Sequence, residues 1–232
     1  MLTAFLICLI ALGLLLRFYL ILPSRNPDRS RKTHLSESCS LAVFLGSGGH
    51  TSEALALVSA LDFSRYTSRT YIVSEGDNFS AQKASALELV KAAKNASPKS
   101  GTYQHSILTV PRARRVHQSL LTTPPTAAHS LMTCLYYVMI APQLLPKGGR
   151  PIFADVLLLN GPGTCFVLCI AVYVTKFLGL PAPQIIYVES FARVQHLSLS
   201  GKLLRPLVDR FVVQWPHLLQ DRGRGECRGW LV

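Results

Sequence analysis

The sequence predicts an α/β domain built on a doubly wound parallel sheet and preceded by one membrane-spanning helix. Residues 1–22 form an apolar run in which Arg17 is the only charge. From residue 41 onward, short apolar runs alternate with segments of helical spacing, which is typical of a parallel sheet. Two of these runs end in glycine-containing turns. The 232 residues, 49% of them apolar, suffice for one domain of about 200 residues plus an anchor, but not for two catalytic domains.

The first segment, Met1–Leu22, has about the length that a bilayer-crossing helix requires. It lacks the basic start and the small-residue cleavage site of a signal peptide. The basic residues between 25 and 32 follow it, so the positive-inside rule places the rest of the chain in the cytosol. We therefore expect a transmembrane anchor at 1–22, a basic tether at 23–40 and a cytosolic domain at 41–232.

The formal charge of +12 indicates an anionic substrate, lipid surface or nucleic acid as partner. The basic residues are scattered and no nucleic-acid-binding motif is present, so we expect no nucleic acid. The six cysteines form no C-x-x-C pair, which favours buried thiols over disulfides or zinc. In a cytosolic domain, the N-glycosylation acceptor patterns at Asn78 and Asn95 are expected to stay unmodified.

The predicted elements alternate regularly along the domain. Leu41–Leu45 is a continuous apolar run, as in a strand buried on both faces, and 51–61 has helical spacing with Thr51 or Ser52 as N-cap. Together the elements predict a Rossmann-like sheet. Further strands are expected at 69–73, 107–110, 156–159, 184–188 and 210–214, and further helices at 80–93 and 165–178.

The segment 127–145 is apolar but holds His129 and Pro142. These residues disfavour a second membrane crossing. A helix covering the sheet and a helix resting on the lipid surface both stay open.

The first buried strand runs into Gly46-Ser47-Gly48-Gly49-His50-Thr51 and then into a helix. Glycines permit a tight turn with close backbone approach, and a helix start presents free N–H groups to an anion. The turn is not G-x-G-x-x-G and lacks the Walker lysine. A second turn, Asn160-Gly161-Pro162-Gly163-Thr164, follows another strand, and such turns meet where the strand order reverses. The two turns therefore predict one anion-binding site.

Two side chains are candidates for a general base. His50 lies at a helix start, where the positive end of the helix keeps an imidazole neutral and able to accept a proton. A capping or phosphate-contacting role is an equal alternative for His50. Glu189 ends another strand at the same rim, where it could orient or deprotonate a sugar hydroxyl or remain a solvated acid.

Together with the anchor, four motifs resemble the asparagine-linked glycosylation protein 14 family, the membrane-anchored subunit of the UDP-N-acetylglucosamine transferase of the dolichol pathway. The resemblance covers nearly the whole chain in the same order. The tail departs from the family pattern at 222–226, where RGRGE precedes the apolar end. The motifs are LAVFLGSGGHTSEAL at 41–55, LLLNGPGT at 157–164, IIYVESFARV at 185–194 and FVVQWP at 211–216.

The resemblance implies the amino-terminal, acceptor-binding half of a GT-B glycosyltransferase, similar to that half of the bacterial peptidoglycan-precursor N-acetylglucosaminyl transferase. A soluble partner of the asparagine-linked glycosylation protein 13 type is expected to bind UDP-GlcNAc, so this chain alone is expected to be inactive. The implied reaction adds the second N-acetylglucosamine to GlcNAc-diphospho-dolichol in N-linked glycosylation. It takes place on the cytosolic face of the endoplasmic reticulum membrane and the contiguous nuclear membrane. No cofactor and no catalytic metal are expected.

The resemblance also assigns roles by position. His50 would be the base that frees the acceptor hydroxyl, and Glu189 would contact the acceptor sugar or the donor. Two alternatives remain: a pure membrane scaffold for the partner, and a dinucleotide-dependent oxidoreductase that holds a ribose with Glu75 or Asp77. The expected substrate-binding residues are Gly46, Ser47, Gly48, Gly49 and Thr51 at the diphosphate, with Asn160, Gly161, Gly163 and Thr164 lining the site.

Overall fold

The computed structural model describes most of the chain, including both glycine-containing turns except Pro162. The predicted tether at 23–40 lies almost wholly outside the described residues, and so do Asn95 and Arg222. The described residues are 1–23, 38–94, 104–114, 118–119, 121–145, 150–161, 163–221 and 223–231.

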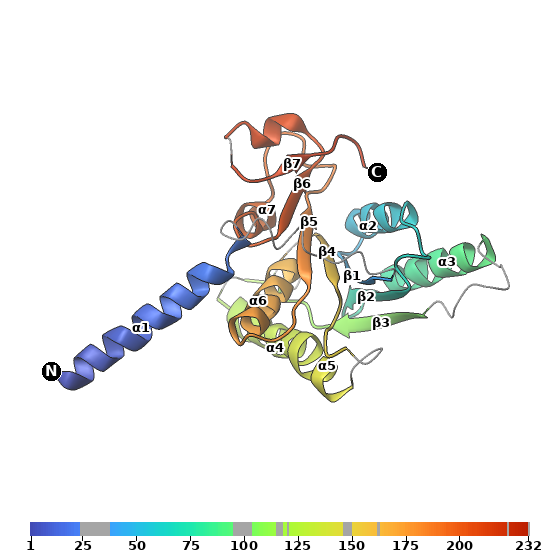
Figure 1. Ribbon diagram of the computed structural model, residues 1–232. Coiled ribbons are helices and arrows are strands. Elements are labelled where there is room, and N and C mark those ends of the chain that lie inside the picture. Colours follow the sequence, from blue (N-terminus) through green and yellow to red (C-terminus); the bar gives the residue numbers. More distant parts are fainter. Residues whose placement is uncertain are drawn as a thin grey trace.

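Seven parallel strands form one sheet in the order β3-β2-β1-β4-β5-β6-β7 (Figure 1). The order runs one way from β1 to β3 and the other way from β4 to β7, so it reverses between β1 and β4. This is the doubly wound, Rossmann-like arrangement that the sequence predicts. The strands are β1 (Ser40–Leu45), β2 (Ser68–Ser74), β3 (Gln104–Val110), β4 (Val156–Asn160), β5 (Gln184–Val188), β6 (Arg210–Val213) and β7 (Glu226–Cys227).

Strand β1 is buried on both faces, as its continuous apolar run predicts. Because successive side chains of a strand point to opposite faces, β1 contributes to two separate core clusters. Leu41, Val43 and Leu45 pack in one cluster, whereas Ala42 and Phe44 pack in the other. The sheet therefore separates two hydrophobic cores.

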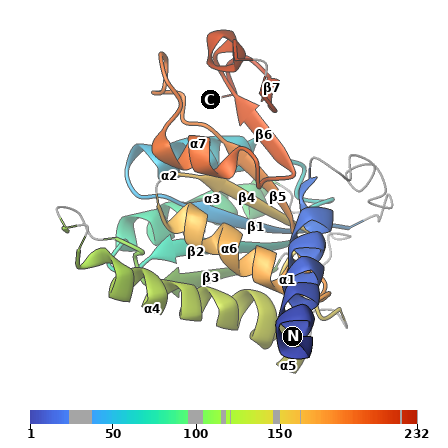
Figure 2. The same cartoon turned by 90° about the vertical axis from the view of Figure 1, so that its left-hand side faces the viewer.

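Helices cover both faces of the sheet (Figures 1 and 2). α2 (Gly49–Ser59) and α3 (Asn78–Lys94) pack on one face, and α4 (Thr123–Leu135), α6 (Thr164–Phe177) and the short α7 (Leu199–Leu204) pack on the other.

The apolar segment 127–145 belongs to one long helical stretch. A π-helical turn, η3 (Tyr136–Ile140), and α5 (Ala141–Leu144) continue α4. Its inner side packs in the core beneath α6, where Cys134 and Val138 are buried. The segment therefore covers the sheet, and contact of its outer side with lipid stays a prediction. Among the described residues, only the helix at Thr3–Ile21 is long and apolar enough to cross a membrane.

This helix, α1 (Leu2–Ile21), ends directly on the domain. The ring of Phe18 lies 6.2 Å from that of Tyr173 on α6, and Ile21 is buried in the core. Arg17 donates to the carbonyl oxygens of Phe177 and Lys176, at 3.2 and 3.4 Å, which lie at the end of α6. Arg17 thus caps α6. The rest of α1 stands clear of the domain (Figure 1), and its apolar window is only 6% buried.

Three of the six cysteines are buried as the sequence predicts, whereas Cys8 and Cys227 are exposed and Cys39 is partly buried. All six are free, and Cys134, Cys165 and Cys169 are buried. Burial raises the pKa of the Cys134 and Cys169 thiols to about 12. These thiols therefore stay protonated and pack as small apolar groups.

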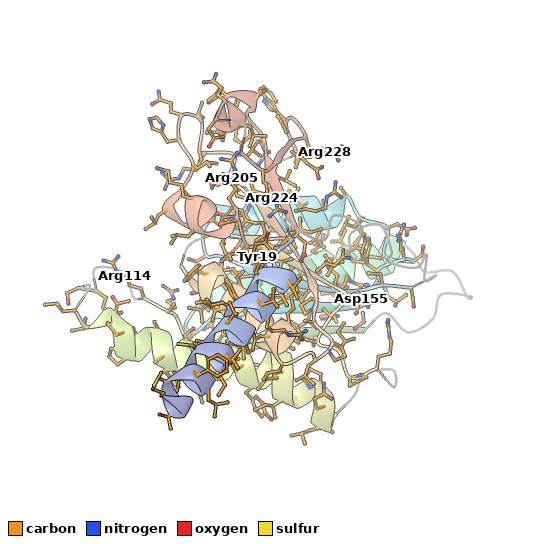
Figure 3. All side chains as sticks on the ribbon, turned by 60° about the vertical axis from the view of Figure 1, so that its left-hand side comes forward. Tyr19, Arg114, Asp155, Arg205, Arg224 and Arg228 are labelled. Carbon is orange, nitrogen blue, oxygen red and sulfur yellow. The ribbon has the colours of Figure 1, made fainter. Side chains whose placement is uncertain are left out.

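The tail differs from expectation, because 210–214 was expected to be the last strand. η4 (Pro216–Leu219) and the two-residue β7 follow it, and β7 pairs with β6 in parallel. Arg210 and Glu226 form an ion pair at 2.7 Å across the two strands. Arg224 donates to the carbonyl of Val208 at 3.2 Å, and Figure 3 shows it beside Arg205 near α7. Backbone pairing of β7 with β6 and arginine side chains therefore attach the tail to the sheet.

Candidate functional site

The turn after β1 is exposed at its tip. Gly46 is buried at the end of the strand, whereas residues 47–49 are exposed. Gly48 has a φ of 67°, in the left-handed region that favours glycine. It forms the N-cap of α2. The glycine therefore turns the chain directly from the strand into the helix.

Helix α2 begins earlier than the sequence predicts. Its first residue is Gly49, so the expected N-caps Thr51 and Ser52 lie inside the helix. Ser52 makes the first helical hydrogen bond, donating its N–H to the carbonyl of Gly48. The N–H groups of the three preceding residues have no acceptor within the helix. They are the groups that an anion at this turn would meet.

The turn after β4 touches the first turn. Gly161 has a φ of 136°, and a Cβ there would lie 3.3 Å from the Cα of Gly46 and 3.7 Å from Cγ of His50. Leu45 and Asn160, the last residues of β1 and β4, pair directly in the sheet. The structure therefore brings the two predicted turns together where the strand order reverses.

A hydrogen-bonded chain links four side chains across this contact. His50 Nδ1 lies 2.9 Å from Asn160 Oδ1, and Asn160 Nδ2 donates to Glu53 Oε2 at 3.0 Å. Ser190 Oγ donates to Glu53 Oε1 at 2.8 Å. Asn160 is fully buried and His50 is half-buried. The chain joins α2, β4 and the segment after β5, and it holds the imidazole at the edge of the site.

The same hydrogen bonds determine which nitrogen of His50 carries the proton. A carboxylate only accepts hydrogen bonds, so the amide nitrogen of Asn160 must face Glu53. Its amide oxygen then faces His50 and accepts from Nδ1–H. In the neutral imidazole, Nε2 then keeps a lone pair that can accept a proton.

Glu189 directly follows β5 at the predicted rim, and hydrogen bonds to Ser190 and Ser198 hold its carboxylate. Oε2 accepts from the N–H and the hydroxyl of Ser198, at 3.1 and 3.0 Å, at the start of α7. Oε1 accepts from the N–H of Ser190 at 3.2 Å. The residue is 1% exposed. A Cβ on Gly201 would lie 2.0 Å from Oε2, so this glycine leaves space for the carboxylate.

Two predicted binding residues turn their side chains into the protein. Thr51 Oγ1 lies 2.6 Å from the hydroxyl of Ser80 at the start of α3. Thr164 Oγ1 accepts from the N–H of Ala113 at 3.4 Å. Only their backbone groups are therefore placed for binding at the turns.

Three glycines of the site have no packing reason to be glycine. Nothing lies within 4 Å of a Cβ built on Gly48, Gly49 or Gly163. Gly48 needs its positive φ, but Gly49 and Gly163 do not. Since neither the fold nor the backbone angle excludes a side chain there, the bare backbone at these helix starts leaves room for a ligand.

Glu53 is the residue that the sequence-based reasoning missed. It lies three positions after His50, a spacing that puts two side chains on the same side of a helix. That spacing was the available signal. The spacing alone did not reveal the contact with Asn160, because Asn160 is remote in the sequence and is brought next to Glu53 by the pairing of strands in the sheet.

Asp77, one of the two acids considered for holding a ribose, caps α3 instead. Its Oδ1 accepts from the N–H of Ser80 at 3.1 Å and its Oδ2 from the Ser80 hydroxyl at 2.7 Å. No group of three His, Cys, Asp or Glu side chains that could hold a metal ion occurs in the part of the chain that the structure describes.

The fold and the site define the class: a doubly wound α/β protein with two adjacent glycine-containing turns at its switch point and an apolar amino-terminal helix. The family described as "Oligosaccharide biosynthesis protein Alg14 like" matches residues 41–231. The chain therefore belongs to the Alg14 family of UDP-N-acetylglucosamine transferase subunits.

Curated relatives agree with this assignment. The UDP-N-acetylglucosamine transferase subunit ALG14 of Cryptococcus neoformans is 46% identical over 89% of this chain and 86% of its own length. The subunit of the same name from Schizosaccharomyces pombe is 44% identical over 95% and 96%. That from Rattus norvegicus is 37% identical over 88% of each chain. No solved structure gives a significant match.

Proposed function

We propose that this chain is the membrane-anchoring, acceptor-binding subunit of the transferase that adds the second N-acetylglucosamine to GlcNAc-diphospho-dolichol. The observation that carries the proposal is the contact between the two glycine-containing turns, with His50 held between them by Asn160. Family membership supplies the donor class, because the relatives are named as UDP-N-acetylglucosamine transferase subunits.

The starts of α2 and α6 would hold the diphosphate. Both helices have a glycine N-cap with an open approach, and both leave their first N–H groups without a helical acceptor. The positive ends of two helix dipoles favour an anion at the same place. A lipid-linked diphosphate matches this arrangement, with its sugar beside His50.

His50 would act as the general base. The acceptor hydroxyl oxygen attacks the anomeric carbon of UDP-GlcNAc, the bond from that carbon to UDP breaks, and Nε2 of His50 takes the hydroxyl proton. Asn160 and Glu53 hold the ring in the tautomer that this step needs. Hydrogen bonds from Ser190 and Ser198 to Glu189 would also hold the segment that carries Ser190.

A soluble partner of the asparagine-linked glycosylation protein 13 type would bind the UDP-sugar. The described part of this chain holds one sheet and one pair of glycine-containing turns, which supports half of a two-domain transferase. The aromatic end of the chain offers a contact for the partner: Trp230 is 73% exposed and its ring packs against Trp215 and Phe191.

α1 would hold the domain at the cytosolic face of the endoplasmic reticulum membrane and of the contiguous nuclear membrane. Its length and apolar surface support the anchor, and the basic residues at 25–32 support the orientation.

Reconstitution tests the proposal. The full chain in detergent, UDP-GlcNAc and a short-chain acceptor are mixed with and without the partner, and the disaccharide lipid is quantified. Product is expected only with the partner, and His50→Ala is expected to slow its formation about 10²- to 10⁴-fold while partner binding persists. Full activity of His50→Ala would instead support a pure scaffold, and product without the partner would contradict the division between two chains.

A further inference from the structure

A cavity of about 730 Å³ lies where α1 meets the domain. Its walls come from the last turn of α1, the end of α6 and the loop that leads into β5. Because this loop precedes its strand, the cavity lies at the amino-terminal edge of the sheet. The glycine-containing turns follow the carboxyl ends of their strands and so lie at the opposite edge. The cavity is therefore separate from the candidate site. Figure 2 shows α1 beside the end of α6.

Two cations and one carboxylate line this junction cavity: Arg17, Lys176 and Asp209. Asp209 Oδ2 accepts from the Lys176 ammonium at 3.0 Å and from the N–H of Ile185 at 2.7 Å, so its charge is already stabilised. Arg17 makes its hydrogen bonds to uncharged carbonyl oxygens. The cavity therefore keeps an excess positive charge, and both cations retain N–H groups that can donate to an anion.

If α1 crosses a bilayer, the cavity lies near the level of the lipid head groups. Arg17 lies near the carboxyl end of α1, from where a cationic side chain can reach the boundary between hydrocarbon and polar head groups. The exposed side chains of α1 on the amino-terminal side of Arg17 are almost all apolar. Leu20 and Pro183 add apolar surface to the wall. The cavity thus places cationic donors next to the apolar surface of α1. This arrangement fits a molecule with an anionic head group and an alkyl chain.

We propose that the junction cavity binds the phosphate of an anionic phospholipid, with Arg17 and Lys176 as donors and the acyl chains lying along α1. The inference rests on the membrane-anchoring part of the proposed function and is independent of catalysis. A lipid at this place fills the space between anchor and domain, and so fixes the angle between them.

The test uses the full chain purified in neutral detergent micelles. Short-chain phosphatidylserine, short-chain phosphatidylcholine and inorganic phosphate are added separately, and the midpoint of thermal unfolding is followed against concentration. Phosphatidylserine is expected to raise the midpoint with saturation, whereas the other two additives leave it unchanged. Equal effects of the two lipids, or no effect of phosphatidylserine, would overturn the proposal. Equal stabilisation by inorganic phosphate would assign the cavity to a soluble anion and contradict a lipid.

Substitutions in the cavity test whether the lipid binds there. Lys176→Gln is expected to weaken phosphatidylserine binding about tenfold, the size of one lost charge-assisted hydrogen bond. Lys202→Gln, which removes an exposed cation on α7 outside the cavity, is the matched control. Wild-type affinity of Lys176→Gln would contradict the assignment.

A second variant serves if Lys176→Gln fails to fold because Asp209 loses its partner. Pro181→Glu adds a carboxylate at the exposed rim without removing a donor, and Pro206→Glu adds one at an exposed proline outside the cavity. Only Pro181→Glu is expected to weaken lipid binding, and equal affinities would contradict the proposal. Alkaline carbonate extraction tests the anchor separately: a chain that stays in the membrane but shows no lipid preference disproves only this inference.

Discussion

At the scale of single residues, a substitution at Gly49 is expected to affect ligand binding without lowering the stability of the fold. A Cβ at Gly49 would meet nothing within 4 Å, and alanine is a better helix former than glycine by about 0.5–1 kcal/mol. Gly49→Ala is therefore expected to leave the free energy of unfolding unchanged or slightly higher, while KM for the acceptor rises about tenfold or more because the methyl group keeps the diphosphate from the backbone. Urea unfolding and steady-state kinetics measure the two effects. An unchanged KM would show that no ligand approaches this turn.

Glu53 is the residue through which the orientation of His50 can be tested. Glu53→Gln offers Asn160 an amide in place of a carboxylate, so the hydrogen-bonded chain no longer imposes one tautomer on His50. We expect kcat to fall roughly 10- to 100-fold with KM for the acceptor nearly unchanged, as for partial loss of general base catalysis.

The control for Glu53→Gln is Ser52→Ala, because Ser52 is exposed and its side chain bonds only to Lys83 among the contacts found in the described residues. If Glu53 acts through His50, the double variant His50→Ala/Glu53→Gln loses no more activity than His50→Ala alone. Fully additive losses would assign Glu53 a separate role.

The sequence predicted only those features of the site that depend on residues adjacent in the sequence. Each turn could be located in the sequence because a buried strand, glycines and a helix start follow one another. The direction of a side chain could not, because it depends on contacts that are remote in the sequence. Glu189 points to Ser198 and Thr51 points to Ser80 for this reason. The catalytic role expected for Glu189 stays a prediction.

At the scale of elements, a buried ion pair joins β2 to α3. Arg69 and Glu88 are 1% and 5% exposed, and two charge-assisted hydrogen bonds of 2.7 Å connect them. Tyr71 donates to the same carboxylate at 2.6 Å. Glu88→Ala is expected to cost about 3–5 kcal/mol, because it removes the carboxylate that balances the charge of a buried guanidinium. The half-exposed pair of Glu226 is the comparison: Glu226→Ala is expected to cost about 0–1 kcal/mol.

The same pair gives a pH dependence with a definite sign. Burial raises the pKa of Glu88, but hydrogen bonds from Arg69 and Tyr71 outweigh burial and leave the pKa below its usual value. A carboxyl group whose pKa is lowered in the folded state contributes stability above its unfolded pKa of about 4.3. That contribution is lost as the pH falls through the folded pKa. The unfolding free energies of wild type and Glu88→Ala should therefore converge in acid, and a constant gap would contradict this origin.

The elements that the sequence revealed are those with a continuous apolar run or a helical pattern. Strands β1, β2, β4 and β5 were predicted to within one residue, because burial on both faces requires such runs. β7 and α7 were missed. β7 has two residues and is held by arginine side chains, and α7 has six residues and starts at a Ser198 cap. Neither leaves a periodic apolar pattern to detect.

At the scale of the whole molecule, α1 and the domain form one packed unit, since Ile21 belongs to the core and Arg17 caps α6. The membrane orientation can be tested at Asn78, which is exposed at the start of α3 within an N-glycosylation pattern. A cytosolic domain never meets the lumenal glycosylation enzyme, so the protein isolated from cells should carry no glycan at Asn78. A mass shift there that glycosidase removes would reverse the orientation.

The most direct measurement of the central claim is photo-crosslinking of the acceptor to this chain alone. A short-tailed GlcNAc-diphosphate lipid with a diazirine beside the diphosphate is irradiated with the full chain, without the partner, and the labelled peptides are mapped by mass spectrometry. The account predicts labels within 46–53 and 160–164, displaced by unlabelled acceptor and reduced in Gly49→Ala. Labels scattered over the surface, or no label within 46–53 and 160–164, would contradict an acceptor site between these two turns.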